Sequence, residues 1–247
     1  PIPYESALAG AAITQSSLAN IYQNGLVIGN GELNAIVYTS GNQIRLRVSK
    51  NDVWDSRINT SADAALPKIN PATGAFSGSG SQPSWNNYVY PTGLPCVEVV
   101  LAAAGGQTSW SSSTLDLAKA SATVISDVDS TTIRALAQTN AFHINSSRAL
   151  SFIGINQAVM DSSGNSIASW VSNVTIGTTN GYSYVRQNIP GDADASGMDV
   201  YVVAGASGTN NVVAVVTSRD SATPLADAVA APGDVWHSRT PAIPTAF

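Results

Sequence analysis

The fold is indicated most clearly by one stretch, Asn34-Ala-Ile-Val-Tyr-Thr-Ser-Gly-Asn-Gln-Ile-Arg-Leu-Arg-Val-Ser49. In its second half, apolar Ile, Leu and Val alternate with Arg, Arg and Ser, which is the pattern of a strand with one buried face. The link Gly41-Asn42 suits a two-residue turn, because such turns need positive φ angles. The stretch therefore predicts a β-hairpin with one wet face.

Similar short runs continue through the chain, separated by Gly, Ser, Asp or Asn and without a helical period between them. Such spacing is typical of antiparallel sandwiches and barrels. Two late runs, 200–204 and 211–217, are apolar on successive residues, which indicates strands buried on both faces. Other strands are expected at 96–101, 113–117, 119–126, 131–138, 140–145 and 150–155. We expect an all-β fold, an antiparallel β-supersandwich with a few short helices.

One domain is expected over 1–231. Residues 58–93 contain four prolines and a Gly/Ser stretch, and they predict a long loop. The best helix candidate is 225–231, with Thr223 as N-cap and Pro224 at the first helical position. The proline-containing residues 232–247 predict an extended tail or the start of a linker.

The composition limits the classes of function. Hydrophobic residues make up 44% and charged residues 11%, which supports a large buried core. The net charge of −5, with only 11 Lys plus Arg and no basic cluster, argues against nucleic acid as a partner. No apolar run is long enough to cross a membrane. Low Lys content and abundant Ser, Thr, Ala and Gly favour a secreted, extracellular protein.

The single cysteine, Cys96, excludes an intrachain disulfide and lies beside an apolar run, so it is predicted to be a buried structural thiol. N-glycosylation sequons start at Asn59, Asn145 and Asn173, and each would suit a surface loop. Their number is what chance gives in a chain this rich in Asn, Ser and Thr.

Two segments resemble a known family. Gly29-Asn30-Gly31 runs into the predicted hairpin, and Asn51-Asp52-Val53-Trp54 follows it. This order resembles the opening of glycoside hydrolases of the α-L-fucosidase kind, family 95 and its relatives. Residues 113–120 and 131–140 are also similar to strand segments of that family. One departure is Asn34, where relatives often have Gly.

The resemblance implies an N-terminal β-supersandwich followed by a helical linker and an (α/α)6 barrel that carries the catalytic carboxylate. By this resemblance, the chain is expected to end where the linker would begin. It is therefore expected to be the non-catalytic N-terminal module of a secreted carbohydrate-active enzyme, with carbohydrate and a helical barrel domain as partners. The alternative is a free-standing glycan-binding lectin on the same sandwich. A hydrolase active by itself is the third hypothesis, but no carboxylate pair stands out.

Residues 51–57 combine amide, carboxylate, indole and guanidinium groups. Sugar recognition uses such a mixture, because hydroxyl groups need polar partners and the apolar sugar face packs on an aromatic ring. The structural alternative is that Trp54 is a buried core anchor of the hairpin and that Asp52 or Asp55 pairs with Arg57. Gly29-Asn30-Gly31 predicts a tight turn, from which Asn30 or Glu32 could also reach a sugar. The predicted carbohydrate-binding residues are Asn30, Glu32, Asn51, Asp52, Trp54, Asp55, Arg57, Trp85, Asn86 and Tyr88.

Residues 192–199 copy the first half of a calcium loop, in which alternate carboxylates point at one ion. The twelfth position is Val203, where an EF-hand requires Glu. The alternatives are a polar surface turn and a looser calcium site formed by Asp192, Asp194, Ser196 and Asp199. No other cofactor is predicted. Glu98 lies within an apolar strand, where it is either a buried acid or part of the solvent face of an edge strand. Alternation favours the solvent face. Neither His143 nor His237 is flanked by a nucleophile motif.

Overall fold

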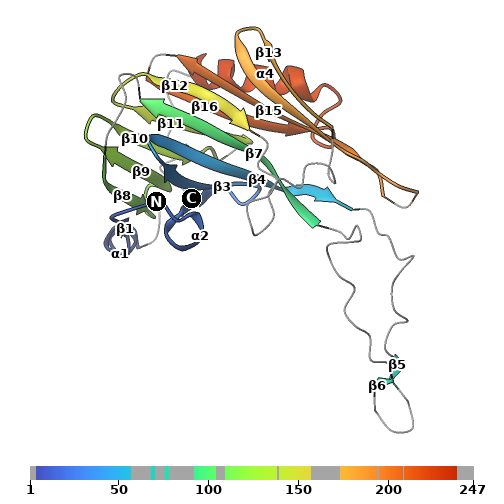
Figure 1. The fold of residues 1–247 in the computed structure, drawn as a ribbon, viewed down its shortest axis with the longest axis horizontal. Coiled ribbons are helices and arrows are strands. Elements are labelled where there is room, and N and C mark those ends of the chain that lie inside the picture. Colours follow the sequence, from blue (N-terminus) through green and yellow to red (C-terminus); the bar gives the residue numbers. More distant parts are fainter. Residues whose placement is uncertain are drawn as a thin grey trace.

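Two antiparallel sheets pack face to face (Figure 1), as the strand pattern predicted. The structure is a computed structural model. It describes residues 4–56, 68–69, 76–77, 92–103, 109–137, 139–156, 173–193, 195–207 and 209–237. The all-β class and the antiparallel sandwich are confirmed.

The smaller sheet has five strands and contains the predicted hairpin. Ser40 pairs with Gln43 across a turn in which Gly41 has a φ of 58°. In order across the sheet, the strands are β12 (Leu150–Asn156), β7 (Thr92–Ala103), β4 (Gln43–Asp55), β3 (Leu33–Ser40) and β2 (Leu26–Gly29). The ends of β4 and β7 project beyond β3 and β12 (Figure 1).

The larger sheet has nine strands. In order they are β1 (Ile13–Gln15), β8 (Trp110–Asp116), β9 (Ser121–Ser126), β10 (Ser130–Ala135), β11 (Ala141–Ser146), β16 (Asn210–Thr217), β15 (Met198–Ser207), β14 (Tyr182–Ile189) and β13 (Asn173–Thr179). The last two, β13 and β14, were not predicted. A separate two-stranded sheet pairs β5 (Lys68–Ile69) with β6 (Phe76–Ser77).

The helices within the described residues are α1 (Glu5–Gly10), α2 (Ile21–Asn24) and α4 (Pro224–His237). The predicted helix is confirmed as α4, but it continues through Pro232 to His237, so the first part of the predicted extended tail is helical. Residues 238–247 lie outside the described residues. Within the described parts of the chain, no helix has the length and apolar character needed to span a membrane.

The core explains the two runs of successive apolar residues. On β16, Val213 and Val215 belong to the core between the sheets, whereas Val212 and Ala214 form a second cluster on the other face. Helix α4 packs against β15 and β16 on that second face. Both strands are therefore buried on two sides, as predicted. Cys96 is also buried, as predicted, and burial raises the pKa of its thiol to about 12.

Glu98 is not solvated, so that prediction was wrong. Its strand β7 lies between β4 and β12, and the side chain is only 5% exposed. The carboxylate accepts hydrogen bonds from Arg45 (2.7 Å) and Arg47 (3.2 Å). Alternation placed Glu98 correctly on the face away from the core, but the two arginines and their surroundings exclude water from it.

Candidate functional site

A bulge in β4 shapes the candidate site. Ser49 pairs with Pro95 and Trp54 pairs with Gly93, so residues 50–53 of β4 lie opposite Leu94 alone. On its other side Lys50 still pairs with Leu33 of β3. Such a bulge bends the strand and redirects its side chains, and bulges are frequent beside functional sites.

Lys50 is the centre of a charged cluster. Its Nζ lies 2.7 Å from Asp52, 2.8 Å from Glu32 and 3.1 Å from Asp220, and its side chain is 0% exposed. Burial by itself would lower the pKa of Lys50, but the hydrogen bonds to Asp52, Glu32 and Asp220 outweigh burial and raise the pKa above 10.5. The ammonium therefore stays charged.

The cluster joins the two sheets. Thr217, the last residue of β16, has its hydroxyl 3.1 Å from both Asp52 and Asp220, and its backbone N–H donates to Asp220 (2.8 Å). Asp52 belongs to the five-stranded sheet, whereas Thr217 ends a strand of the nine-stranded sheet. These contacts fix the bulge against the neighbouring layer.

The predicted tight turn before β3 is confirmed. The side-chain oxygen of Asn30 accepts from the N–H groups of Glu32 (3.0 Å) and Leu33 (2.8 Å), and Gly31 has a φ of 97°. The amide nitrogen of Asn30 donates to Leu136 O (2.9 Å), which fastens this turn to the connection between β10 and β11.

A small polar pocket lies between this turn and the β10–β11 connection. Its volume is about 170 Å³, and it is lined by Asn30, Glu32, Ala137, Thr139 and Asn140. The amide of Asn140 donates to Glu32 (3.2 Å), the same carboxylate that binds Lys50. The pocket therefore offers amide, hydroxyl and carboxylate groups close to the bulge.

Trp54 is not a core anchor, so that hypothesis was wrong. The side chain is 45% exposed, while Val53 beside it is 0% exposed. Two contacts hold the ring: Nε1 donates to the carbonyl oxygen of Asn51 (2.7 Å), and the ring lies against Gly93, where a Cβ would be 3.6 Å from it. A fixed, half-exposed indole therefore borders the bulge.

Five of the predicted carbohydrate-binding residues meet here, namely Asn30, Glu32, Asn51, Asp52 and Trp54. Asp55 is buried at the end of β4, and Asp52 pairs with Lys50. The predicted residues Arg57, Trp85, Asn86 and Tyr88 lie outside the described residues, as does the sequon at Asn59.

Sequence reasoning missed Lys50, Asn140, Thr217 and Asp220. A signal for Lys50 was present, since it continues the buried positions Ile44, Leu46 and Val48 at the same spacing of two. A buried lysine is almost always paired with carboxylates. The alternating pattern, which places Lys50 at a buried position, therefore predicts an ion cluster around it. Its partners lie far away in sequence, and no local pattern identifies them.

The residues proposed for calcium have other roles in the described part of the chain. Both carboxylate oxygens of Asp199 accept from Arg186 (2.9 and 3.1 Å), and Asn188 adds a third bond (2.8 Å). Burial raises the pKa of Asp199, but these bonds outweigh it and lower the pKa overall. Asp192 accepts from the N–H of Ala195 within its own turn (2.8 Å).

Ser196 is exposed, and Asp194 lies outside the described residues. Among the side chains that are described, no three His, Cys, Asp or Glu come close enough to hold a metal ion. The calcium site stays a prediction for Asp194 and its neighbours.

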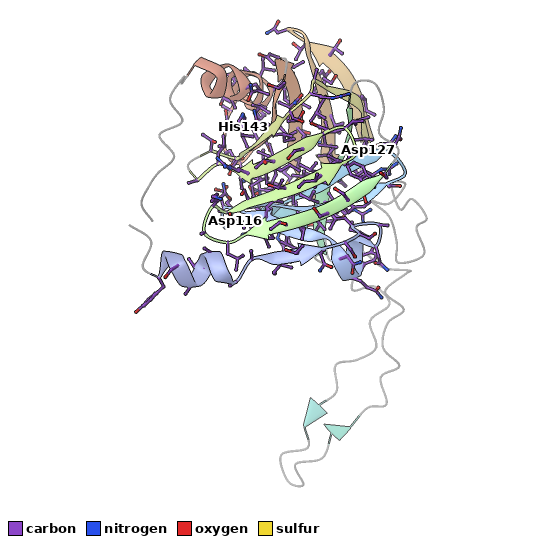
Figure 2. The ribbon with its side chains drawn as sticks, turned by 90° about the vertical axis from the view of Figure 1, so that its left-hand side faces the viewer. Asp116, Asp127 and His143 are labelled. Carbon is purple, nitrogen blue, oxygen red and sulfur yellow. The ribbon has the colours of Figure 1, made fainter. Side chains whose placement is uncertain are left out.

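Other polar side chains are spread over the outer face of the nine-stranded sheet. Figure 2 shows His143, Asp116 and Asp127 well apart from one another, so they form no catalytic group. His143 Nε2 lies 3.2 Å from Asn210 Oδ1, and burial lowers the pKa of its imidazole.

The described sequons lie in strands rather than in the surface loops that were expected. Asn145 is exposed on β11 and donates to Asn210 (2.9 Å). Asn173 is the first residue of β13.

Comparison of the sequence with protein-family models and with curated proteins finds no match. The resemblance to family 95 glycoside hydrolases therefore stays a prediction that rests on the two quoted segments.

Proposed function

We propose that this chain is a non-catalytic β-sandwich module of a secreted carbohydrate-active enzyme and that it contacts glycan at the β4 bulge. The observation that carries this proposal is the ring of Trp54, which is 45% exposed yet held by a hydrogen bond at its nitrogen and by packing against Gly93. An exposed indole that is already ordered loses little conformational entropy when a ligand packs on it.

The groups around the ring suit a sugar. The apolar C–H face of a pyranose packs on an indole, and its hydroxyl groups pair with amides and carboxylates. Asn51 is exposed beside the ring, and Glu32 and Asn140 line the polar pocket next to the bulge. The site therefore combines one apolar platform with several polar partners.

The same cluster argues against hydrolysis. Glycoside hydrolases place two carboxyl groups on either side of the scissile bond, with space between them for the sugar or a water molecule. Here the space between Glu32, Asp52 and Asp220 holds the Nζ of Lys50, at 2.7 to 3.1 Å from each. The space that hydrolysis would need between these three acids is thus filled by a resident cation.

Trp54→Ala is expected to weaken glycan binding at least tenfold, which corresponds to about 1.4 kcal/mol. The melting temperature should change little, because a half-exposed ring contributes little to the core. A glycan array selects the probe, and calorimetry measures the dissociation constant. The control is Tyr22→Ala, which removes a 76% exposed ring on α2. Equal losses in both variants, or unfolding of Trp54→Ala, would contradict the proposal.

The purified chain is expected to leave aryl fucosides and aryl galactosides intact. The measurement is release of the aryl alcohol over a long incubation at high protein concentration. The proposal of a non-catalytic module fails if the alcohol is released and if Glu32→Gln or Asp52→Asn stops the release. These two variants keep the shape of the cluster and change its charge.

A further inference from the structure

We propose a second binding site, for a neutral oligosaccharide, in the groove between α4, β15 and the turn that follows β13. The groove has a volume of about 450 Å³, within the usual range of small-molecule sites. Its lining residues are Thr179, Asn180, Tyr201, Thr223, Pro224, Leu225, Ala226 and Val229.

This groove is separate from the Trp54 site. Tyr201 lies on the face of β15 that points away from the core, because its neighbours Val200 and Val202 are both core residues. Helix α4 packs on the same outer face, over β15 and β16 (Figure 1). Trp54 belongs to the other sheet, so a ligand in the groove would not touch it.

A chain of contacts holds the ring of Tyr201. The guanidinium of Arg186 lies over this ring, 5.9 Å from its centroid. Arg186 is bound by Asp199, whose own backbone N–H donates to Ser218 (3.0 Å). The cation–π contact and the ion pair fix the aromatic surface before any ligand arrives.

A second tyrosine lies on this face of the sheet, outside the groove lining. Tyr184 precedes Arg186 by two residues in β14, so it lies on the same face as Tyr201. Its ring crosses Gly177 of β13, where a Cβ would be only 2.7 Å from the ring. Glycine at this position lets the ring lie across the neighbouring strand.

The lining selects a neutral, hydrogen-bonding ligand. None of the eight lining residues carries a charge, so a charged ligand would lose hydration without gaining a counter-ion. A purely apolar partner would bury the hydroxyl groups of Thr179 and Thr223 and the amide of Asn180. A pyranose matches both parts, because it has an apolar face for Tyr201 and hydroxyl groups for the polar side chains.

The test is a titration with four neutral hexasaccharides, namely cellohexaose, xylohexaose, mannohexaose and laminarihexaose. Backbone amide shifts of the isotopically labelled chain report binding up to about 5 mM, which covers millimolar dissociation constants. At least one hexasaccharide is expected to shift the amides of 179–181, 201–203 and 225–229.

Two variants should weaken this binding at least tenfold: Tyr201→Ala removes the ring, and Ala226→Arg fills the groove. Ala226 is an exposed residue of α4, so this second variant keeps the test valid if Tyr201→Ala folds poorly. The matched control is Ala230→Arg, one turn further along the same helix at an exposed position outside the lining. Trp54→Ala should leave the groove shifts unchanged.

The proposal is overturned if none of the four hexasaccharides shifts the groove amides. It is equally overturned if Ala226→Arg binds as tightly as Ala230→Arg, or if Trp54→Ala abolishes the groove shifts. The last result would place the ligand at the β4 bulge and would support the first proposal instead.

Discussion

Replacing Lys50 with methionine is expected to lower the free energy of unfolding by about 3 kcal/mol at pH 7. The substitution fills the volume of the lysine stem but removes the cation that Glu32, Asp52 and Asp220 share. Three carboxylates would then repel one another beside a buried apolar side chain. The three carboxylate side chains are between 26% and 54% exposed, so water partly screens their repulsion. The expected loss of stability therefore lies near the lower end of the range for broken buried ion pairs.

The loss should depend on pH. In the wild type the pKa of Lys50 is raised by folding, so its contribution is complete below pH 10.5 and is lost as the pH rises above that value. Denaturant unfolding of the wild type and of Lys50→Met at several pH values measures this effect.

Lys119→Met is the matched control. Lys119 also pairs with a carboxylate, Asp116 (2.9 Å), but its side chain is 69% exposed. Its removal should leave the unfolding midpoint unchanged within error. If the two methionine variants are equally stable at pH 7, the Lys50 cluster does not stabilise the fold as its geometry indicates.

The hairpin could be predicted because the residues that determine its pairing are neighbours in the sequence. Alternation at 44–48 and the Gly41-Asn42 turn specify the pairing of β3 with β4 within sixteen residues, 34–49. Strands β13 and β14 were not predicted. Strand β13 lies at the end of its sheet and exposes even its central Ile176 (62%). Such an end strand mixes polar and apolar side chains, so the alternation in its sequence is weak.

Trp54 shows where extrapolation of a pattern fails. Strict alternation from Ile44, Leu46 and Val48 would place residues 50, 52 and 54 on the buried face. The bulge at 50–53 reverses this order, so Val53 and Asp55 are buried and Trp54 turns outward. A bulge depends on how the neighbouring strand pairs, and the sequence of β4 alone does not contain that information.

The charged cluster could be predicted only in part. Lys50 at a core position implies carboxylate partners, and Asp52 is two residues away. Asp220 is 170 residues away, and it reaches Lys50 only because β16 ends beside the bulge. The packing of one sheet on the other decides that meeting, and single-sequence patterns do not encode it.

Glu98→Ala is expected to lower the free energy of unfolding by about 3 kcal/mol. The carboxylate is 5% exposed and neutralises Arg45 and Arg47, whose side chains are only 29% and 19% exposed. Without it, two guanidinium groups would repel each other on adjacent positions of one strand face. The control Asp199→Ala removes a more exposed partner of Arg186 and should cost about 1 kcal/mol or less.

A triple variant distinguishes two contributions to the free energy of unfolding: the stabilisation by the intact ion cluster and the destabilisation by charges that are left unpaired. Arg45→Met, Arg47→Met and Glu98→Leu together leave no unpaired charge, and apolar replacement of a buried ionic group is often neutral or stabilising. The triple variant should therefore be more stable than Glu98→Ala. Burial and the contact with Glu98 raise the pKa of Tyr38, so that pKa should fall toward 10.0 in Glu98→Ala, as measured by NMR of labelled tyrosine. A triple variant less stable than Glu98→Ala would mean that the ion cluster itself, rather than the avoidance of unpaired charge, stabilises this face of the sheet.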